Sequence, residues 1–254
     1  MLEAHALTVQ VGPHRLLDTV DIVAPPGHVT VVIGPNGAGK STLFHALAGG
    51  VLPREGSIAL FSRQLRDWPA AALARQRAVL TQNPSLGFDF QTDEVVRLGR
   101  IPHARDANRD DDIVKAALAT VGLGDLSKRR YLTLSGGEKQ RVHIARALAQ
   151  IWDASPRARC LMLDEPTVNL DFAQKKVALE AVRAIARDGG TVLVVLHELN
   201  LAAQFADRLV LLASGRVVAE GPPREVLTPQ ALEHAYGAPA TVFTHPHDGR
   251  PVVL

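Results

Sequence analysis

The fold is decided by one stretch, Val29-Thr30-Val31-Val32-Ile33-Gly34-Pro35-Asn36-Gly37-Ala38-Gly39-Lys40-Ser41-Thr42. A β-branched apolar run stops at a glycine-rich turn, and apolar residues resume behind it at helical spacing. Gly34, Gly39, Lys40 and Ser41 satisfy the pattern G-x-x-x-x-G-K-[ST] in this strand and helix context. The stretch therefore predicts a strand, a phosphate-binding loop and a helix, and a chance glycine turn is the disfavoured alternative.

The chemistry of such a loop follows from its backbone. Glycines at 34, 37 and 39 permit positive φ and let a phosphate approach the chain, while the helix that follows offers unpaired N–H groups and a partial positive charge. Lys40 is expected to reach the β- and γ-phosphates, and the Ser41 hydroxyl to bind magnesium. The residues expected to bind nucleotide here are Gly34, Pro35, Asn36, Gly37, Ala38, Gly39, Lys40, Ser41 and Thr42.

Composition limits the class of protein. The chain has 254 residues, of which 46% are apolar and only 4% aromatic, which is typical of an α/β protein of one or two domains. A net charge of +2 argues against a nucleic-acid partner held by bulk electrostatics. The single cysteine, Cys160, excludes an internal disulfide and begins an apolar run, so a buried, inert thiol is expected.

Targeting signals are also absent from the sequence. No segment has the layout of a signal peptide, and no apolar run approaches the roughly 18 residues that a membrane span needs. The chain is therefore expected to be cytosolic by itself and to reach a membrane only through a partner.

Periodicity along the chain predicts strands and helices in alternation, with a change to purely helical spacing between Phe88 and Arg130. That segment is interpreted as an inserted helical lobe. The main predicted strands are 6–11, 16–23, 58–61 and 77–80, and the main predicted helices are 70–77, 95–98, 113–121 and 172–187.

A second helix start lies at Leu134-Ser135-Gly136-Gly137-Glu138. Ser135 and Glu138 fit a capping box, which by itself predicts only an ordinary capped helix. The two glycines lower helix propensity but allow an anion to approach the first-turn amides, which favours a binding role.

Two further apolar strands end in polar residues. The first ends at Asp164-Glu165, where one carboxylate is placed to bind magnesium and the next to orient or deprotonate an attacking water. The second runs from Thr191 to Leu196 and stops at His197, at the end of a strand where ligands of α/β sheets bind.

Taken together, these motifs resemble the ATP-binding-cassette (ABC) transporter ATPases over nearly the whole chain. The resemblance implies an α/β fold: a P-loop NTPase ABC-ATPase core with an antiparallel β subdomain and an inserted α-helical subdomain. It implies a single nucleotide-binding domain, 1–254, in which 1–87 and 157–254 form the core with its β subdomain and 88–156 form the helical subdomain with the signature helix. ATP and Mg²⁺ are the implied cofactors, and no guanine-reading motif is present.

The resemblance also assigns roles. It implies a head-to-tail homodimer that holds two ATP molecules between the phosphate loop of one copy and the signature of the other. Ser41, Gln82 and Asp164 would serve magnesium, Glu165 would be the catalytic base, and His197 the γ-phosphate sensor, with Gln82 and His197 counted in the catalytic set. The residues that would act in trans or couple the two sites are Ser135, Gly136, Gly137, Glu138 and Asp171.

One position departs from the family. The aromatic residue that usually stacks on adenine near the end of the first strand is replaced by Val11. Either His14 or Arg15 substitutes for it, or adenine is held loosely.

The cargo is indicated by subfamily resemblance. Segment 94–103 resembles the helical lobe of ATPases that serve importers of iron chelates, haem and vitamin B12. Segments 141–152 and 195–203 are most similar to the ATPases of the hemin-import branch. This implies two transmembrane permease subunits, an indirect periplasmic or extracellular substrate-binding protein, no nucleic acid, and a peripheral place on the cytoplasmic face of the inner membrane. A ferric siderophore or cobalamin importer is the alternative, and a soluble scaffold ATPase a more distant one.

Overall fold

The computed structural model describes residues 1–82 and 86–254 and divides into two compact units. The first unit contains Met1–Asp67 together with Thr191–Leu254, and the second contains Trp68–Gly190. The chain thus leaves the first unit once and returns to it once. The predicted helical insertion, 88–156, lies wholly inside the second unit.

A parallel sheet carries the phosphate-binding stretch in the first unit. Strand β3 (Val29–Ile33) pairs in parallel with β8 (Thr191–Val195) on one side and β9 (Arg208–Ala213) on the other, and β10 (Arg216–Gly221) runs antiparallel to β9. Every residue of β3 and β8 is buried. Helix α1 (Lys40–Leu47) follows the loop after β3. This arrangement puts the carboxyl ends of β3 and β8 at one edge of the sheet.

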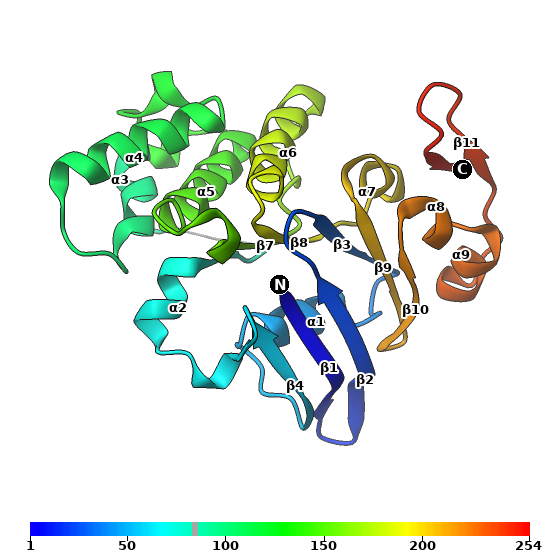
Figure 1. The fold of residues 1–254 in the computed structure, drawn as a ribbon. Coiled ribbons are helices and arrows are strands. Elements are labelled where there is room, and N and C mark those ends of the chain that lie inside the picture. The colour runs from blue at the N-terminus through cyan, green and yellow to red at the C-terminus, as the bar shows by residue number, and fades with distance from the viewer. Residues whose placement is uncertain (83–85) are drawn as a thin grey trace. The chain divides into compact units, whose positions relative to one another are not determined.

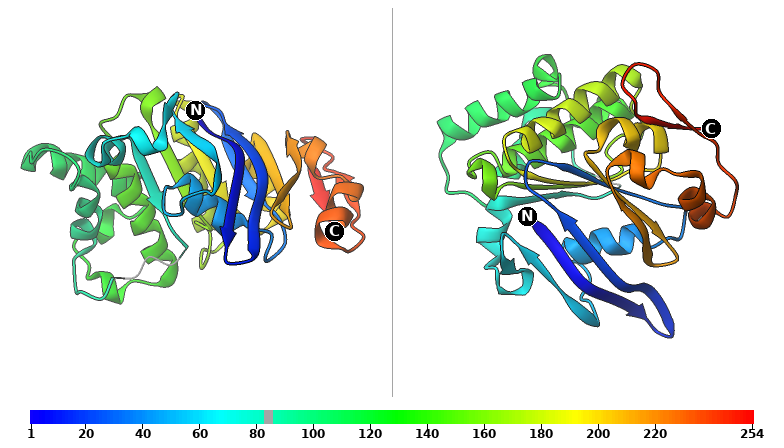
Figure 2. Two further views of the ribbon diagram at one scale, coloured as in Figure 1. Left: turned by 90° about the horizontal axis from the view of Figure 1, so that it is seen from below. Right: turned by 45° about the vertical axis from the view of Figure 1, so that its right-hand side comes forward.

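A four-stranded antiparallel sheet forms the rest of the N-terminal region (Figures 1 and 2), in the order β2, β1, β4, β5. Its strands are β1 (Leu2–Val11), β2 (His14–Ala24), β4 (Glu55–Leu60) and β5 (Arg63–Gln64), and a short 3₁₀ turn, Leu65–Asp67, follows β5. Strands β1 and β2 are longer than predicted from the sequence. The register shifts between Ala4 and Leu7, and Ala6 has a positive φ of 48°, so a bulge interrupts the alternation on which the prediction relied.

The C-terminal region of the first unit was not predicted element by element. It contains α7 (Leu199–Phe205), α8 (Pro223–Val226), α9 (Pro229–Tyr236) and a hairpin of β11 (Val242–Thr244) and β12 (Pro251–Val253). The Asn200 side chain joins the hairpin to α7, because its amide nitrogen donates to the Val253 carbonyl at 3.0 Å and its oxygen accepts from the Val253 N–H at 2.8 Å.

A parallel strand pair anchors the second unit. Strand β6 (Arg77–Leu80) pairs with β7 (Cys160–Asp164), and α2 (Ala70–Gln76) precedes β6. All of β7 is buried. Helix α6 runs from Phe172 to Arg187, so the predicted bounds of this helix and of β6 are confirmed.

The remaining helices of the second unit pack together as a lobe (Figure 1). They are α3 (Thr92–Arg97), α4 (Ala107–Thr120) and α5 (Gly136–Gln150), with 3₁₀ turns at Leu98–Arg100, Gly124–Leu126, Tyr131–Thr133 and Pro156–Ala158. Their apolar faces share a core that includes Val95, Val96, Val114, Leu118, Val142 and Leu148. The helical spacing seen in the sequence arises from these inward-facing residues.

None of the helices in the described part of the chain combines the length and apolar character of a membrane span.

Candidate active site

The phosphate loop has the backbone that its sequence predicts. Gly34, Gly37 and Gly39 have φ of 149°, 77° and 99°. Gly39 is the N-cap of α1, and among the described residues no side chain caps this helix and no acidic residue lies in its first turn. The first-turn amides and the helix dipole are therefore directed toward a negative ligand.

The glycines meet two different requirements. A Cβ on Gly34 would lie 2.0 Å from the Leu212 carbonyl oxygen, and one on Gly39 would lie 2.9 Å from the Leu16 carbonyl oxygen. A Cβ on Gly37 would have no heavy atom within 4 Å among the described residues. The loop therefore needs glycine at 34 and 39 to pack against β9 and β2, whereas only the Gly37 position faces open space.

The Lys40 side chain folds back over the loop. Its Nζ donates to the carbonyl oxygens of Gly34 at 2.7 Å and Pro35 at 2.8 Å, and the residue is buried. The two carbonyl oxygens hold the Lys40 ammonium beside the loop, where its charge adds to that of the first-turn amides of α1.

Tyr236 is a neighbour of this loop that the sequence analysis missed. Burial raises the pKa of its phenol, and a hydrogen bond with the backbone of Gly34 acts in the opposite direction. Tyr236 is the last residue of α9, and nothing in its local sequence pattern predicts a contact with a loop some 200 residues earlier. The contact ties the C-terminal region to the phosphate loop.

His197 lies at the same edge of the first unit's sheet as Gly34. Val32 of β3 pairs with Val195 of β8, and the Leu196 N–H donates to the Val32 carbonyl at 3.1 Å. The exposed His197 follows directly. The prediction that His197 follows the end of this strand is confirmed.

The second unit gathers the carboxylates and Gln82 at one strand edge. Leu80 of β6 pairs with Leu163 of β7, so Asp164, the last residue of β7, and Gln82, two residues after β6, both lie at the carboxyl ends of parallel neighbours. Gln82 is exposed, whereas Asp164 is 1% exposed. The three residues that follow Gln82, Asn83 to Ser85, lie outside the described residues.

Glu165 has an unusual backbone for a non-glycine residue. Its φ is 51°, in the left-handed region, and only 8% of its surface is exposed. Such a conformation costs on the order of 1 kcal/mol or more and is found most often at functional sites. A buried carboxylate held in a strained turn is the arrangement expected of a group with a chemical task.

The signature turn opens α5 with the capping box that its sequence predicts. Ser135 Oγ accepts from the Glu138 N–H at 3.2 Å, and the Ser135 N–H donates to Glu138 Oε2 at 2.7 Å. That backbone hydrogen bond is the main reason why the pKa of Glu138 is below its usual value. The amide of Ser135 is thus satisfied within the turn.

Gly137 lets the signature turn approach the chain that follows Glu165. A Cβ on Gly137 would lie 2.2 Å from Gln174 Oε1 and 2.9 Å from the Asn169 carbonyl oxygen. Asp171 caps α6 by accepting from the Gln174 N–H at 2.8 Å. The signature turn and the segment 169–174 are therefore packed against each other, a contact that the sequence analysis did not predict.

The donor set suits magnesium. Ser41, Gln82 and Asp164 supply hydroxyl, amide and carboxylate oxygens, the donor types that a hard divalent cation prefers. Among the described residues there is no group of three or more His, Cys, Asp and Glu side chains that could hold a metal by itself.

Cys160 has no part in this chemistry. It is fully buried at the start of β7, and burial raises the pKa of its thiol to about 12. The predicted inert thiol is confirmed.

The first unit contains a buried strand, a glycine loop and a helix with a lysine at its start, and the second unit contains a buried strand that ends in carboxylates. These elements define a phosphate-loop nucleotide-binding protein. The ABC transporter family matches residues 17–168 of the chain. The chain belongs to this family, and it is an ATP-hydrolysing subunit of an ABC transporter.

Relatives cover the whole chain. It is 48% identical to a hemin import ATP-binding protein HmuV of Gloeobacter violaceus, across 100% of this chain and 94% of that protein. It is 46% identical to the HmuV protein of Pseudomonas aeruginosa, across 100% and 99%. Among solved structures, an inward-facing metal-chelate type ABC transporter superposes with a TM-score of 0.82 at 25% identity, across 99% of this chain and 95% of that chain. A nucleotide-free ATP-binding cassette, with a TM-score of 0.75 and 24% identity over 94% of this chain and 96% of that chain, shows the same fold.

Proposed function

We propose that this chain powers the import of hemin or a related iron chelate, as one of two identical ATPase subunits bound to a pair of permease subunits at the cytoplasmic face of the inner membrane. The main support for hemin as the cargo is the full-length identity of 48% to a hemin import ATP-binding protein. An extracellular or periplasmic binding protein would deliver the cargo to the permease.

The phosphate loop binds the triphosphate in this proposal. The open amides of α1 and the Lys40 ammonium neutralise phosphate charge, which is the main catalytic task in phosphoryl transfer. When bound, Mg²⁺ would neutralise the β- and γ-phosphate oxygens. Ser41, Gln82 and Asp164 are assigned to it because of their oxygen donors and their places after a loop and two strands.

Glu165 is the proposed general base. Its carboxylate is buried next to Asp164, and its strained backbone fixes where the side chain begins. His197 is assigned to the γ-phosphate because it ends the strand beside the phosphate-loop strand.

The signature turn is assigned to the nucleotide of a second copy. Ser135, Gly136, Gly137 and Glu138 form the start of α5, where the exposed Ser135 and Gly136 let an anion approach the positive end of the helix dipole. With Asp171 close behind in the same packed region, ATP binding would draw two copies together head to tail, and hydrolysis would release them.

The permease is proposed to contact the helical lobe. Ile101 is 75% exposed just after the 3₁₀ turn that follows α3, within the segment 94–103 that resembles importers. An isolated apolar side chain on a firmly packed turn suits a protein contact. Adenine recognition is proposed to rely on the exposed side chains of Val11 and His14, because the other candidate, Arg15, is engaged by Asp18 at 2.8 Å.

The catalytic part is tested with Glu165→Gln, which keeps the size of the side chain and removes the base. We expect ATP binding to persist, phosphate release to fall by about 10² to 10⁴-fold, and a closed dimer to accumulate in light scattering. Glu233→Gln, at an exposed carboxylate of α9, is the control and should hydrolyse ATP normally. Undiminished turnover in Glu165→Gln would remove Glu165 from the mechanism.

The cargo is tested with the ATPase and its permease in liposomes together with the binding protein. Hemin should stimulate ATP hydrolysis and accumulate inside, while ferric siderophores and cobalamin should not. Stimulation by either of those two and not by hemin would support the alternative importers instead. Purification as a complex of soluble proteins only would support a scaffold ATPase.

A further inference from the structure

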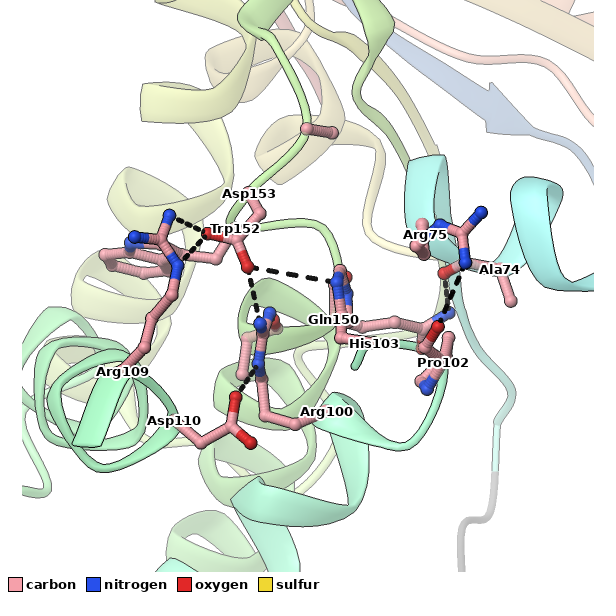
Figure 3. Close-up of polar contacts among 12 residues, drawn as sticks. Ala74, Arg75, Arg100, Pro102, His103, Arg109, Asp110, Gln150, Trp152 and Asp153 are labelled. Carbon is pink, nitrogen blue, oxygen red and sulfur yellow. Dashed lines mark hydrogen bonds and ion pairs between the residues drawn. The ribbon is translucent and has the colours of Figure 1, made fainter. Parts of the chain in front are cut away.

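Gln150 makes three polar connections at the end of α5 that lies away from the signature turn, and Figure 3 shows this residue with two of its partners, Ala74 and His103. Its side-chain Nε2 donates to the carbonyl oxygens of Ala74 at 2.8 Å and Arg77 at 2.9 Å. Its backbone oxygen lies 2.7 Å from His103 Nε2, an N–H···O distance at which the imidazole donates. One residue thus joins α5 to the end of α2, the start of β6 and the turn after α3.

The neighbouring charges lock this helix end. The buried Arg100 guanidinium donates to the Ala149 carbonyl at 2.9 Å and to Asp110 at 2.8 Å, and it also pairs with Asp153. Burial by itself would raise the pKa of Asp153, but the hydrogen bonds from Arg109 and Arg100 outweigh it and leave the pKa below its usual value. A cation at a helix C-terminus also complements the helix dipole, so the end of α5 is held by both charge and hydrogen bonds.

The same region is closely packed. A Cβ on Gly99 would lie 2.3 Å from the Arg146 carbonyl oxygen in α5, so the turn after α3 touches the helix backbone itself. Close-packed interiors transmit strain rather than absorb it. The end of α5 therefore moves together with the groups that hold it.

Gln150 lies where two elements of the second unit meet: α5, which begins at the signature turn, and β6, which leads to Gln82. Along α5, 15 residues at about 1.5 Å each place the signature turn about 22 Å away. Along β6, 4 residues at about 3.3 Å each lead over about 13 Å to the strand end, shortly before Gln82. A tilt of about 5° at Gln150 would move the far end of α5 by about 2 Å, which is enough to disturb catalytic positioning.

We infer that Gln150 is a positioning residue whose side-chain amide fixes the angle between α5 and β6 and thereby keeps the signature turn and Gln82 in register. The inference rests on the proposed function of those two groups. It assigns to Gln150 the coupling between the groups that a chain offers to its own nucleotide and to its partner's nucleotide.

The test uses two variants that remove the donor but keep the length of the side chain. Gln150→Met replaces the amide by an apolar group, and Gln150→Glu places a carboxylate against two carbonyl oxygens. Arg187→Ala is the matched control, because Arg187 pairs with Glu180 on the exposed surface of α6, outside the groups assigned to nucleotide or permease. The three variants and the wild type are each measured as the full chain bound to its permease.

Two readouts decide the inference. In both Gln150 variants we expect kcat for ATP to fall by about 10 to 100-fold while KM for ATP stays within about twofold, because the phosphate loop is untouched. Hydrogen exchange should accelerate at the amides of the signature turn and of 77–82, and Arg187→Ala should change neither readout. Wild-type kcat and exchange in the Gln150 variants, or the same losses in Arg187→Ala, would overturn the inference.

The exchange readout also separates the two claims. If the wild-type chain did not hydrolyse ATP, the proposed function would fail. Faster exchange at the signature turn and at 77–82 in the Gln150 variants would still support the positioning role of Gln150, and unchanged exchange would overturn that role.

Discussion

At the scale of single residues, three glycines of this protein lie where the backbone closely approaches another part of the chain. Gly34 and Gly39 pack against carbonyl oxygens of neighbouring strands, and Gly137 packs against Gln174 and Asn169. The phosphate-loop motif predicts which residues are needed at 34 and 39. It does not predict the reason, because the neighbours come from distant parts of the chain.

Gly137→Ala tests the close approach at the signature turn. The added methyl would meet Gln174 Oε1 at 2.2 Å and the Asn169 carbonyl at 2.9 Å, so we expect the turn to shift and kcat to fall by about 10²-fold. Gln174→Ala alone should have a small effect.

The double variant Gly137→Ala with Gln174→Ala should regain part of the lost rate, because one of the two obstacles is gone. A double variant no faster than Gly137→Ala would show that Gln174 is not in the way. Steady-state ATPase assays, with circular dichroism to confirm folding, supply the comparison.

At the scale of elements, local signals were sufficient where a segment stabilises itself. The bounds of β6 and α6 match the sequence prediction, and the capping box of α5 forms as predicted. Strand β1 began earlier than predicted because a bulge at Ala6 disturbs the alternation. The hairpin of β11 and β12 was not predicted, since it is held by a side chain of α7 and carries little pattern of its own.

Glu138 makes the start of α5 sensitive to pH. Its pKa is lowered in the folded chain, mainly by the Ser135 N–H, so the stabilisation is present above the unfolded pKa of about 4.3 and is lost as pH falls through the folded value. Glu138→Gln should therefore melt at a lower temperature than the wild type at pH 7, and the difference should shrink on acidification below about pH 4. A difference that is the same at pH 7 and pH 3 would show that charge plays no part.

At the scale of the whole molecule, sequence reasoning identified the family and predicted the strand and helix ends at which its motifs lie. The motifs at the phosphate loop, the signature, Asp164-Glu165 and His197 each lie at a strand or helix end, as predicted. Tyr236, Gln174 and Gln150 were missed because their importance lies in contacts between segments far apart in the chain. Such contacts leave no local pattern.

The central claim is that each ATP-binding site is formed by groups from two copies of the chain. Mixing two inactive variants tests this claim most directly. Lys40→Ala damages only the phosphate loop and Ser135→Arg only the signature turn, so each homodimer should be nearly inactive. In a one-to-one mixture with random pairing, half the dimers carry one intact site, and ATPase activity should return to about a quarter of the wild-type value. Full activity of Ser135→Arg alone, or no recovery on mixing, would contradict the account.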